Sequence, residues 1–211
     1  MKFAKWLRKS DPAEKFAEQL ARNCRSMASE RVNKSLIDAT KYLHIRDFVQ
    51  LLVFNSYSMT TILEEDDEID RKQFSFVFFE HVNFFMFLLD RAASSRMDIQ
   101  TRSTLMREVT DFAFVLSIVT LLPRLQGHEK DKLYDRCMRN LIALIEEYSK
   151  YDLIPIEDEG AHENTALWEF SKKIQEFTKD PYNLGGMVGY QFQIIQAMKN
   201  IDINSFLEKM K

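Results

Sequence analysis

The segment from Phe74 to Asp90, FSFVFFEHVNFFMFLLD, constrains the fold more than any other part of the sequence. It holds seven of the chain's 17 phenylalanines. Burying one Phe or Leu side chain is worth roughly 1.5–3 kcal/mol, so a helix this apolar does not stay exposed to water. Because apolar residues occur on every side of such a helix, the segment predicts a buried central helix around which the other elements pack.

A membrane span is the alternative interpretation of the same segment. A span needs about 20 apolar residues and tolerates charged side chains poorly. This run is shorter and carries Glu80 and His81 near its middle. We therefore expect the core helix of a helical bundle and no transmembrane segment.

Few residues interrupt the rest of the chain, which has five Gly and four Pro in 211 residues. Such a low content of Gly and Pro favours long helices over many short strands. The sequence predicts one all-α domain over residues 1–211, a bundle of about seven or eight helices. Helical spacing places them from Asp11 onward, then at 32–43, 47–63, 74–90, 101–122, 128–150, 167–177, 184–199 and 203–211, and leaves open whether the first two are contiguous.

Charge and cysteine content limit the classes of partner and the compartment. The net charge is −3 and the pI about 5.9, which gives no general attraction to nucleic acid. Cys24 and Cys137 lack the spacing of a zinc site or a disulfide framework, so we expect buried, reduced thiols. The N-terminus lacks the apolar core of a secretion signal, and together these features favour a cytoplasmic protein.

Two further segments have open roles. Residues 1–9, MKFAKWLRK, interleave basic and apolar side chains and form either a membrane-surface contact or a frayed or docked terminus. Residues 151–165 are the longest predicted loop. Loops of this length are often functional, but the sequence does not indicate what this one does.

Polar residues within the apolar helices are the main candidates for a ligand or metal site. Glu80, His81 and Asn83 lie on the central helix, and Glu108 and Asp111 lie on the next apolar helix. Carboxylates on facing helices of a bundle can line an interior pocket, where burial raises the pKa of a carboxyl group. The sequence does not identify a cofactor or metal for such a pocket.

A satisfied core is the other interpretation of the same residues. In that case His81 is hydrogen-bonded to a carbonyl or hydroxyl group, and Glu80 is paired with Arg91, Arg107 or a tyrosine. Buried charges without partners are costly, which makes pairing the simpler explanation.

An acidic cluster, Asp66-Asp67-Glu68-Ile69-Asp70, has carboxylates at a spacing that can hold Mg²⁺ against a diphosphate. It resembles the aspartate-rich DDxxD motif of isoprenoid synthases, which are also all-helical. Near the C-terminus, Asn200, Asn204 and Glu208 have the spacing of the second metal motif of terpene cyclases, although that motif has Ser or Thr where Asn204 stands. The resemblance implies a diphosphate–Mg²⁺ site at Asp66, Asp67 and Asp70, and the alternative is a solvated acidic helix end.

The sequence contains no coherent catalytic set and leaves two functional hypotheses. The first is a helical interaction or regulatory protein that binds a protein partner or a second copy of itself. The second is a small-molecule or metal-binding bundle, either a binding protein or an enzyme, with a carboxylate-lined interior. The first predicts open docking surfaces, and the second predicts carboxylates that converge inside.

Overall fold

The described part of the chain folds into α-helices, as its apolar periodicity predicts. The structure, a computed structural model, describes residues 12–32, 34–66, 68–152, 165–180 and 184–210. Within these residues the elements are α1 (Pro12–Arg31), α2 (Ala39–Glu65), α3 (Phe74–Ser94), α4 (Ile99–Leu121), α5 (Gly127–Tyr148), α6 (Ala166–Gln175), α7 (Leu184–Ile201) and α8 (Ile203–Lys209). The described residues contain no strand, only one isolated bridge between Asp152 and Thr165. The prediction of an all-α bundle is confirmed.

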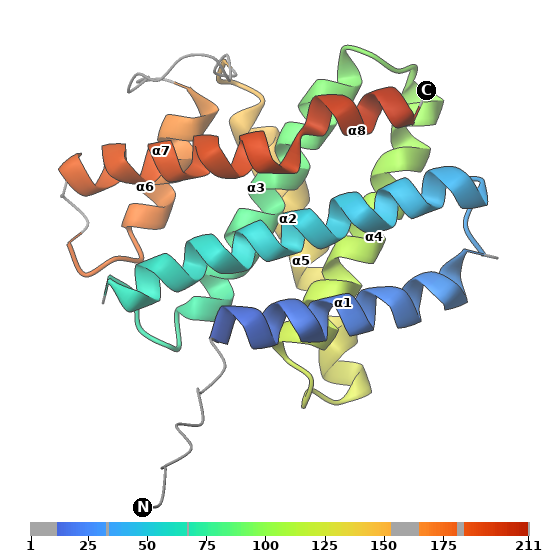
Figure 1. Ribbon diagram of the computed structural model, residues 1–211. Helices are drawn as coiled ribbons and strands as arrows, with labels where there is room; N and C mark the ends of the chain where they lie inside the picture. The colour runs from blue at the N-terminus through green and yellow to red at the C-terminus, as the bar shows by residue number, and fades with distance from the viewer. Residues whose placement is uncertain (1–11, 33, 67, 153–164, 181–183, 211) are drawn as a thin grey trace, which may run out of the picture.

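The helices form two layers that cross each other (Figure 1). In one layer α1 and α7 flank α2, and α8 continues beyond α7 along α2. The other layer contains α3, α4 and α5, which contact one another. The core lies between the layers, where α2 packs on α3 and α4.

Helix α3 is the central helix that the Phe-rich segment predicts. It packs against α2, α4, α5, α6 and α8, and every residue from Val77 to Phe79 and from His81 to Asp90 is buried. The ring of Phe84 stacks on Phe170 of α6 with centroids 4.0 Å apart. Phe76 is the exception: it is 55 % exposed near the start of α3, with the guanidinium of Arg136 above its ring.

The observed boundaries of helix α2 differ from those predicted for this part of the chain. The sequence predicts a boundary between residues 43 and 47, whereas α1 ends at Arg31 and α2 continues without a break from Ala39 to Glu65. The side chain of Asp38 caps α2 by accepting hydrogen bonds from the backbone N–H groups of Thr40 and Lys41. A capped start after an irregular connection explains why the break comes earlier than apolar spacing indicates.

Substitution of this cap should destabilise the protein measurably. We expect Asp38→Ala to lower the free energy of unfolding by about 1 kcal/mol, because two backbone donors at the start of α2 lose their acceptor. Urea denaturation followed by circular dichroism measures the change. Asp135→Ala, at an exposed position of α5, is the control and should cost less than about 0.5 kcal/mol. Equal losses in both variants would contradict the assigned role of Asp38.

Two sequence expectations concern residues that the structure does not describe. The basic segment 1–9 and residues 153–164 of the predicted loop both lie outside the described ranges. Among the helices that are described, none combines the length and apolar character needed to cross a bilayer.

Candidate functional site

His81 of α3 is fully buried and held by three helices. Its Nδ1 lies 2.7 Å from the carbonyl oxygen of Val77 and 3.1 Å from the hydroxyl of Thr60 on α2, and its Nε2 is hydrogen-bonded to the hydroxyl of Tyr190 on α7. Because the carbonyl only accepts, Nδ1 carries the proton and Nε2 accepts from Tyr190. Burial lowers the pKa of His81 to about 3, so the imidazole is neutral. The ring therefore has carbonyl and hydroxyl partners within the protein.

Glu80, the neighbour of His81, points to another part of the bundle. Its carboxylate forms an ion pair with the ammonium group of Lys173 on α6, 2.8 Å away. The sequence-based expectation of Arg91, Arg107 or a tyrosine as partner is wrong, because α6 rather than α4 covers this side of α3.

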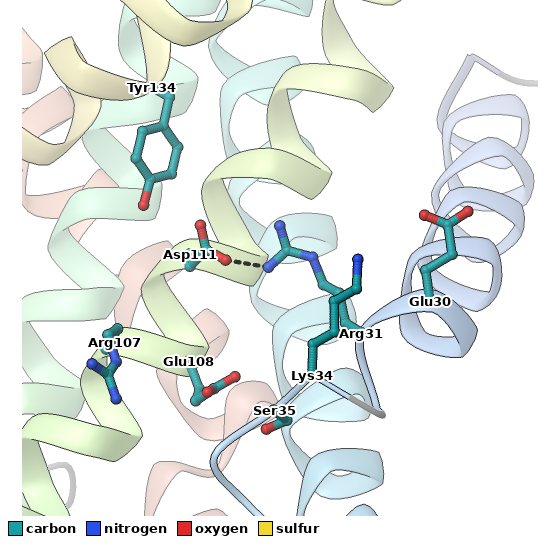
Figure 2. A pocket seen from close by; sticks show the side chains of 8 residues that line it. All are labelled: Glu30, Arg31, Lys34, Ser35, Arg107, Glu108, Asp111 and Tyr134. Atoms are coloured by element: carbon teal, nitrogen blue, oxygen red, sulfur yellow. Dashed lines mark hydrogen bonds and ion pairs between the residues drawn. The ribbon is translucent and has the colours of Figure 1, made fainter.

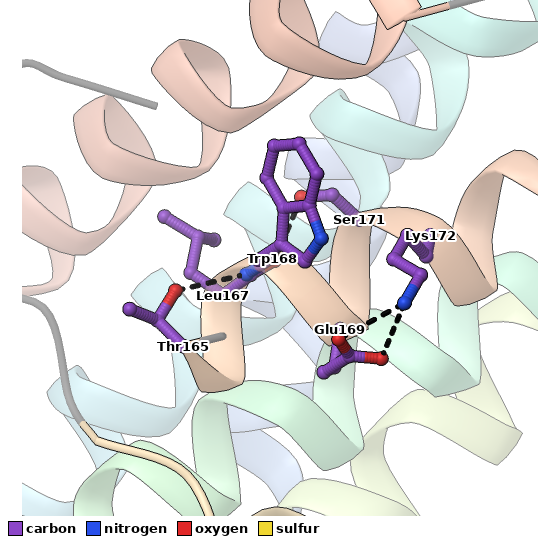
Figure 3. A network of polar contacts seen from close by, with 6 residues as sticks. All are labelled: Thr165, Leu167, Trp168, Glu169, Ser171 and Lys172. Carbon is purple, nitrogen blue, oxygen red and sulfur yellow. Dashed lines mark hydrogen bonds and ion pairs between the residues drawn. The ribbon is translucent and has the colours of Figure 1, made fainter. Parts of the chain in front are cut away.

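Helix α6, which carries Lys173, has local polar contacts in its first two turns (Figure 3). The hydroxyl of Thr165 accepts a hydrogen bond from the backbone N–H of Trp168 and caps the helix. One turn later, Lys172 pairs with Glu169 through both carboxylate oxygens. The next residue, Lys173, forms the ion pair with Glu80.

Besides His81, the buried polar residues of α3 are Asn83 and Asp90. Asp90 is 6 % exposed and receives two hydrogen bonds from the guanidinium of Arg102 on α4. Asn83 is completely buried, and neither atom of its amide has a hydrogen-bond partner among the described residues. It therefore lies in the core, apart from the His81 network.

Glu108 and Asp111 lie on α4 but not in the interior with Glu80, His81 and Asn83. The carboxylate of Glu108 accepts a hydrogen bond of 3.0 Å from the backbone N–H of Leu36, in the connection between α1 and α2. Asp111 forms an ion pair with Arg31 at the end of α1. The predicted convergence of all five residues on one interior pocket is thus not what the structure shows.

Glu108 and Asp111 instead line an open cleft between α1, α4 and α5 (Figure 2). We call it the charged cleft; its volume is about 590 Å³. Three cationic and three anionic side chains line it together with one tyrosine and one serine. These residues are Glu30, Arg31, Lys34, Ser35, Arg107, Glu108, Asp111 and Tyr134.

Two of the residues that line the charged cleft, Arg31 and Asp111, form an ion pair with each other. Figure 2 shows Arg31 reaching across to Asp111, with Tyr134 of α5 directed toward the same carboxylate. Burial, and then the negative charge of Asp111, raise the pKa of Tyr134 to about 12. The tyrosine is therefore a neutral donor or acceptor at neutral pH, and not a base.

A second tyrosine lies close to the charged cleft. Tyr42 of α2 is 1 % exposed, and its hydroxyl has no hydrogen-bond partner among the described residues. Burial raises its pKa to about 12; Arg31 opposes this shift, and Glu108 and Asp111 add to it. The charges that act on this buried hydroxyl are thus mainly those of the cleft.

Sequence reasoning missed most of this site. Arg31, Lys34, Arg107 and Tyr134 come from three helices and one connection, and nothing in their local spacing links them. One signal was present: Arg107, Glu108 and Asp111 form a polar turn in a helix whose later half is apolar. Such a turn indicates a side of α4 that does not face the core.

The two motifs that resemble those of isoprenoid synthases do not meet. Asp66 caps the C-terminus of α2, Asp70 accepts from the backbone N–H groups of Lys72 and Gln73, and Asp67 lies outside the described residues. These residues come just before α3, whereas Asn204 binds Arg96 just after it. The 21 residues of α3 separate the two by about 30 Å.

The second motif is also divided within itself. Asn200 lies on α7 and reaches Asn55 of α2, whereas Asn204 and Glu208 lie on α8. The chain turns between them at Asp202, which has a positive φ of 45° and caps α8. The interpretation as paired metal motifs is therefore not supported by the arrangement of these residues. Within the described ranges, no group of three or more His, Cys, Asp or Glu residues is placed to hold a metal ion.

Comparison of the chain with protein-family models, with curated proteins and with solved structures found no match. The function is therefore inferred from the geometry of the charged cleft and the core.

Proposed function

We propose that this chain is a helical interaction module that docks a charged segment of a protein partner in the charged cleft. The observation that carries the proposal is the state of its ionic groups. Six charged side chains line the cleft. Only Arg31 and Asp111 form an ion pair with each other, and the carboxylate of Glu108 accepts a hydrogen bond from the backbone N–H of Leu36. Glu30, Lys34 and Arg107 have no side-chain partner within the described part of the chain.

The state of the core supports a binding surface outside it. His81 uses both ring nitrogens within the protein, and Glu80 is paired with Lys173. The interior polar groups that a buried ligand site would use are in these two cases already occupied. An open cleft with charged residues at its rim is the arrangement that protein interfaces use to orient a partner.

The composition of the rim also suits a protein segment. Glu30, Lys34 and Arg107 are exposed, whereas Tyr134 and Asp111 are half-buried below them. Interfaces commonly combine an aromatic or arginine centre with a solvent-accessible polar rim. Arg31, whose guanidinium lies 6.0 Å from the ring centroid of Phe112, can serve as an arginine centre of this kind.

Binding of a small molecule is the second candidate function, and one observation favours it. The volume of the charged cleft lies within the range of about 300–1,000 Å³ that ligand pockets occupy. Native mass spectrometry of the purified protein separates the two: a bound small molecule adds a fixed mass to each subunit, whereas self-association changes the number of subunits.

A cytoplasmic location is part of the proposal. Cys24 and Cys137 are both free and buried, and burial raises the pKa of the Cys24 thiol to about 11 and that of the Cys137 thiol to about 12. Two unpaired thiols fit a reducing compartment.

Site-specific photocross-linking tests the proposal. A benzoylphenylalanine at Ser103, one turn before Arg107 on the exposed face of α4, should capture a discrete protein upon irradiation in a cell extract. Reversal of two charges, in the double variant Lys34→Glu and Arg107→Glu, should reduce the yield of that adduct several-fold, because surface ion pairs steer association. A purified sample irradiated alone shows whether the captured protein is a second copy.

The matched control places the same photoreactive group at Gln196, an exposed residue of α7 in the other layer. The proposal requires that this position does not capture the same adduct. It is overturned if Gln196 captures it equally, if charge reversal leaves the yield unchanged, or if Ser103 captures nothing.

A further inference from the structure

We infer that the segment bound in the charged cleft carries groups of both signs, an acidic and a basic side chain close together. This inference rests on the proposed function and specifies the chemistry of the partner. The cleft is lined by Arg31, Lys34 and Arg107 and by Glu30, Glu108 and Asp111, so its lining charges balance. A ligand of one sign would meet as much repulsion as attraction there.

The cationic groups available to the partner are those of Arg107 and Lys34. Figure 2 shows them on different sides of Glu108, one from α4 and one from the connection after α1. Both are exposed, and neither has a side-chain partner in the described ranges. A guanidinium presents a planar fork that matches a carboxylate, so Arg107 is the preferred position for the acidic group of the partner.

The anionic groups available are those of Glu108 and Glu30. One oxygen of Glu108 accepts from the N–H of Leu36, which fixes the carboxylate in place and leaves the other oxygen for a ligand. Glu30 extends from the last turn of α1, beyond Arg31 and Lys34 as seen from Glu108 in Figure 2. Glu108, which is held in place, is therefore the preferred position for the basic group of the partner.

The Arg31–Asp111 pair explains why a polar group rather than an apolar one fits the base of the cleft. The pair already satisfies Arg31 and Asp111, so these two residues form a neutral, strongly polar surface between the two free sets.

Three capped tripeptides test the inference on the full chain. The probes are acetyl-Glu-Gly-Lys-amide with both signs, acetyl-Glu-Gly-Gln-amide with the acidic group alone, and acetyl-Gln-Gly-Lys-amide with the basic group alone. Each is titrated into ¹⁵N-labelled protein while amide chemical shifts are followed. We expect the mixed peptide to shift amides at the end of α1 and in the middle of α4 saturably, with about five-fold higher affinity than either single-charge peptide.

Two variants assign the two halves of the site. Arg107→Gln should remove the advantage of the mixed peptide over the basic one, and Glu108→Gln should remove its advantage over the acidic one. Glutamine at 108 retains an oxygen that can accept from the Leu36 N–H, so the connection keeps its hydrogen bond. Arg71→Gln and Glu18→Gln, at exposed positions away from the cleft, are the controls and should change neither preference.

The outcomes distinguish failure of this inference from failure of the proposed function. Equal or tighter binding of a single-charge peptide, or the absence of saturable shifts with all three, overturns the mixed-charge inference. Cross-linking at Ser103 that responds to charge reversal would still support the interaction module in that case. Conversely, mixed-peptide binding without any cross-linked protein would confirm the chemistry of the cleft and refute a protein partner.

Discussion

Acidification from pH 6.5 to pH 5 should lower the free energy of unfolding by about 1.6 kcal/mol through His81 alone. In the unfolded chain the imidazole takes up its proton near pH 6.5, whereas in the folded protein its pKa is about 3. Between these values the unfolded state binds more protons, so stability falls as the pH falls. The contribution of His81 is complete above pH 6.5 and is lost progressively toward pH 3.

Burial explains why the folded protein resists this proton. Tyr190 donates to Nε2 and Nδ1 donates to Val77, so both nitrogens of the neutral ring are satisfied, and a second proton would place a charge where water does not reach it. Thr60 already donates its hydroxyl proton to the carbonyl oxygen of Ser56, so its oxygen only accepts from His81. Phe170, whose ring packs edge-on against the imidazole, provides no compensating charge.

Urea denaturation at several pH values between 6.5 and 5 measures this slope, in a range above the titration of ordinary carboxyl groups. The His81→Gln protein should be less stable at pH 7, and its free energy of unfolding should depend much less on pH between 6.5 and 5. This reduced pH dependence is the diagnostic result. His128→Gln, at an exposed position of α5, controls for removal of a histidine as such. A His81→Gln protein that keeps the parent slope would show that another group carries the acid sensitivity.

Phe84→Ala should lower the free energy of unfolding by about 3–5 kcal/mol, the largest single-residue effect that we expect in this protein. The ring is completely buried, stacks on Phe170 with centroids 4.0 Å apart, and meets the edge of Tyr148 on α5. Its removal leaves a cavity where α3, α5 and α6 meet, and relaxation of three helices cannot fill it fully.

Chemical denaturation compares this variant with Phe76→Ala, a matched change on the same helix. Phe76 is 55 % exposed, so its loss should cost less than about 1.5 kcal/mol. If Phe84→Ala does not fold, Phe84→Leu keeps most of the volume and should cost about 1–2 kcal/mol. Similar losses at positions 76 and 84 would contradict the assignment of α3 as the buried centre.

The fold class was predictable because the apolar pattern of the sequence indicates directly which segment must be buried. Seven phenylalanines within 17 residues permit few locations other than a core, and α3 lies there. The start of α2 was harder to predict because residues 32–43 have helical spacing even though Asp38 begins a new helix. A single capping hydrogen-bond acceptor decided between two helix boundaries that apolar spacing alone does not separate.

The candidate site was only partly predictable, because side-chain position depends on how helices rotate against each other. Glu108 and Asp111 were identified as polar residues of an apolar helix, but their direction depends on where α1 crosses α4. Arg31 and Lys34 lie far from them in the sequence. For His81, the sequence allowed both a ligand site and a satisfied core; the partners Thr60 and Tyr190 come from α2 and α7, which no local pattern connects.

The packing of α8 on α2 has a consequence for the order in which parts of the chain fold during synthesis. The ring of Phe206 stacks on Phe48 of α2 with centroids 4.0 Å apart, and the ammonium group of Lys41 donates to the carbonyl oxygen of Met210. A ribosome makes α2 early and α8 on the order of ten seconds later, at ordinary rates of elongation. Throughout that interval the side of α2 around Phe48 lacks the cover that α8 provides, so the nascent chain exposes this apolar surface until α8 has emerged.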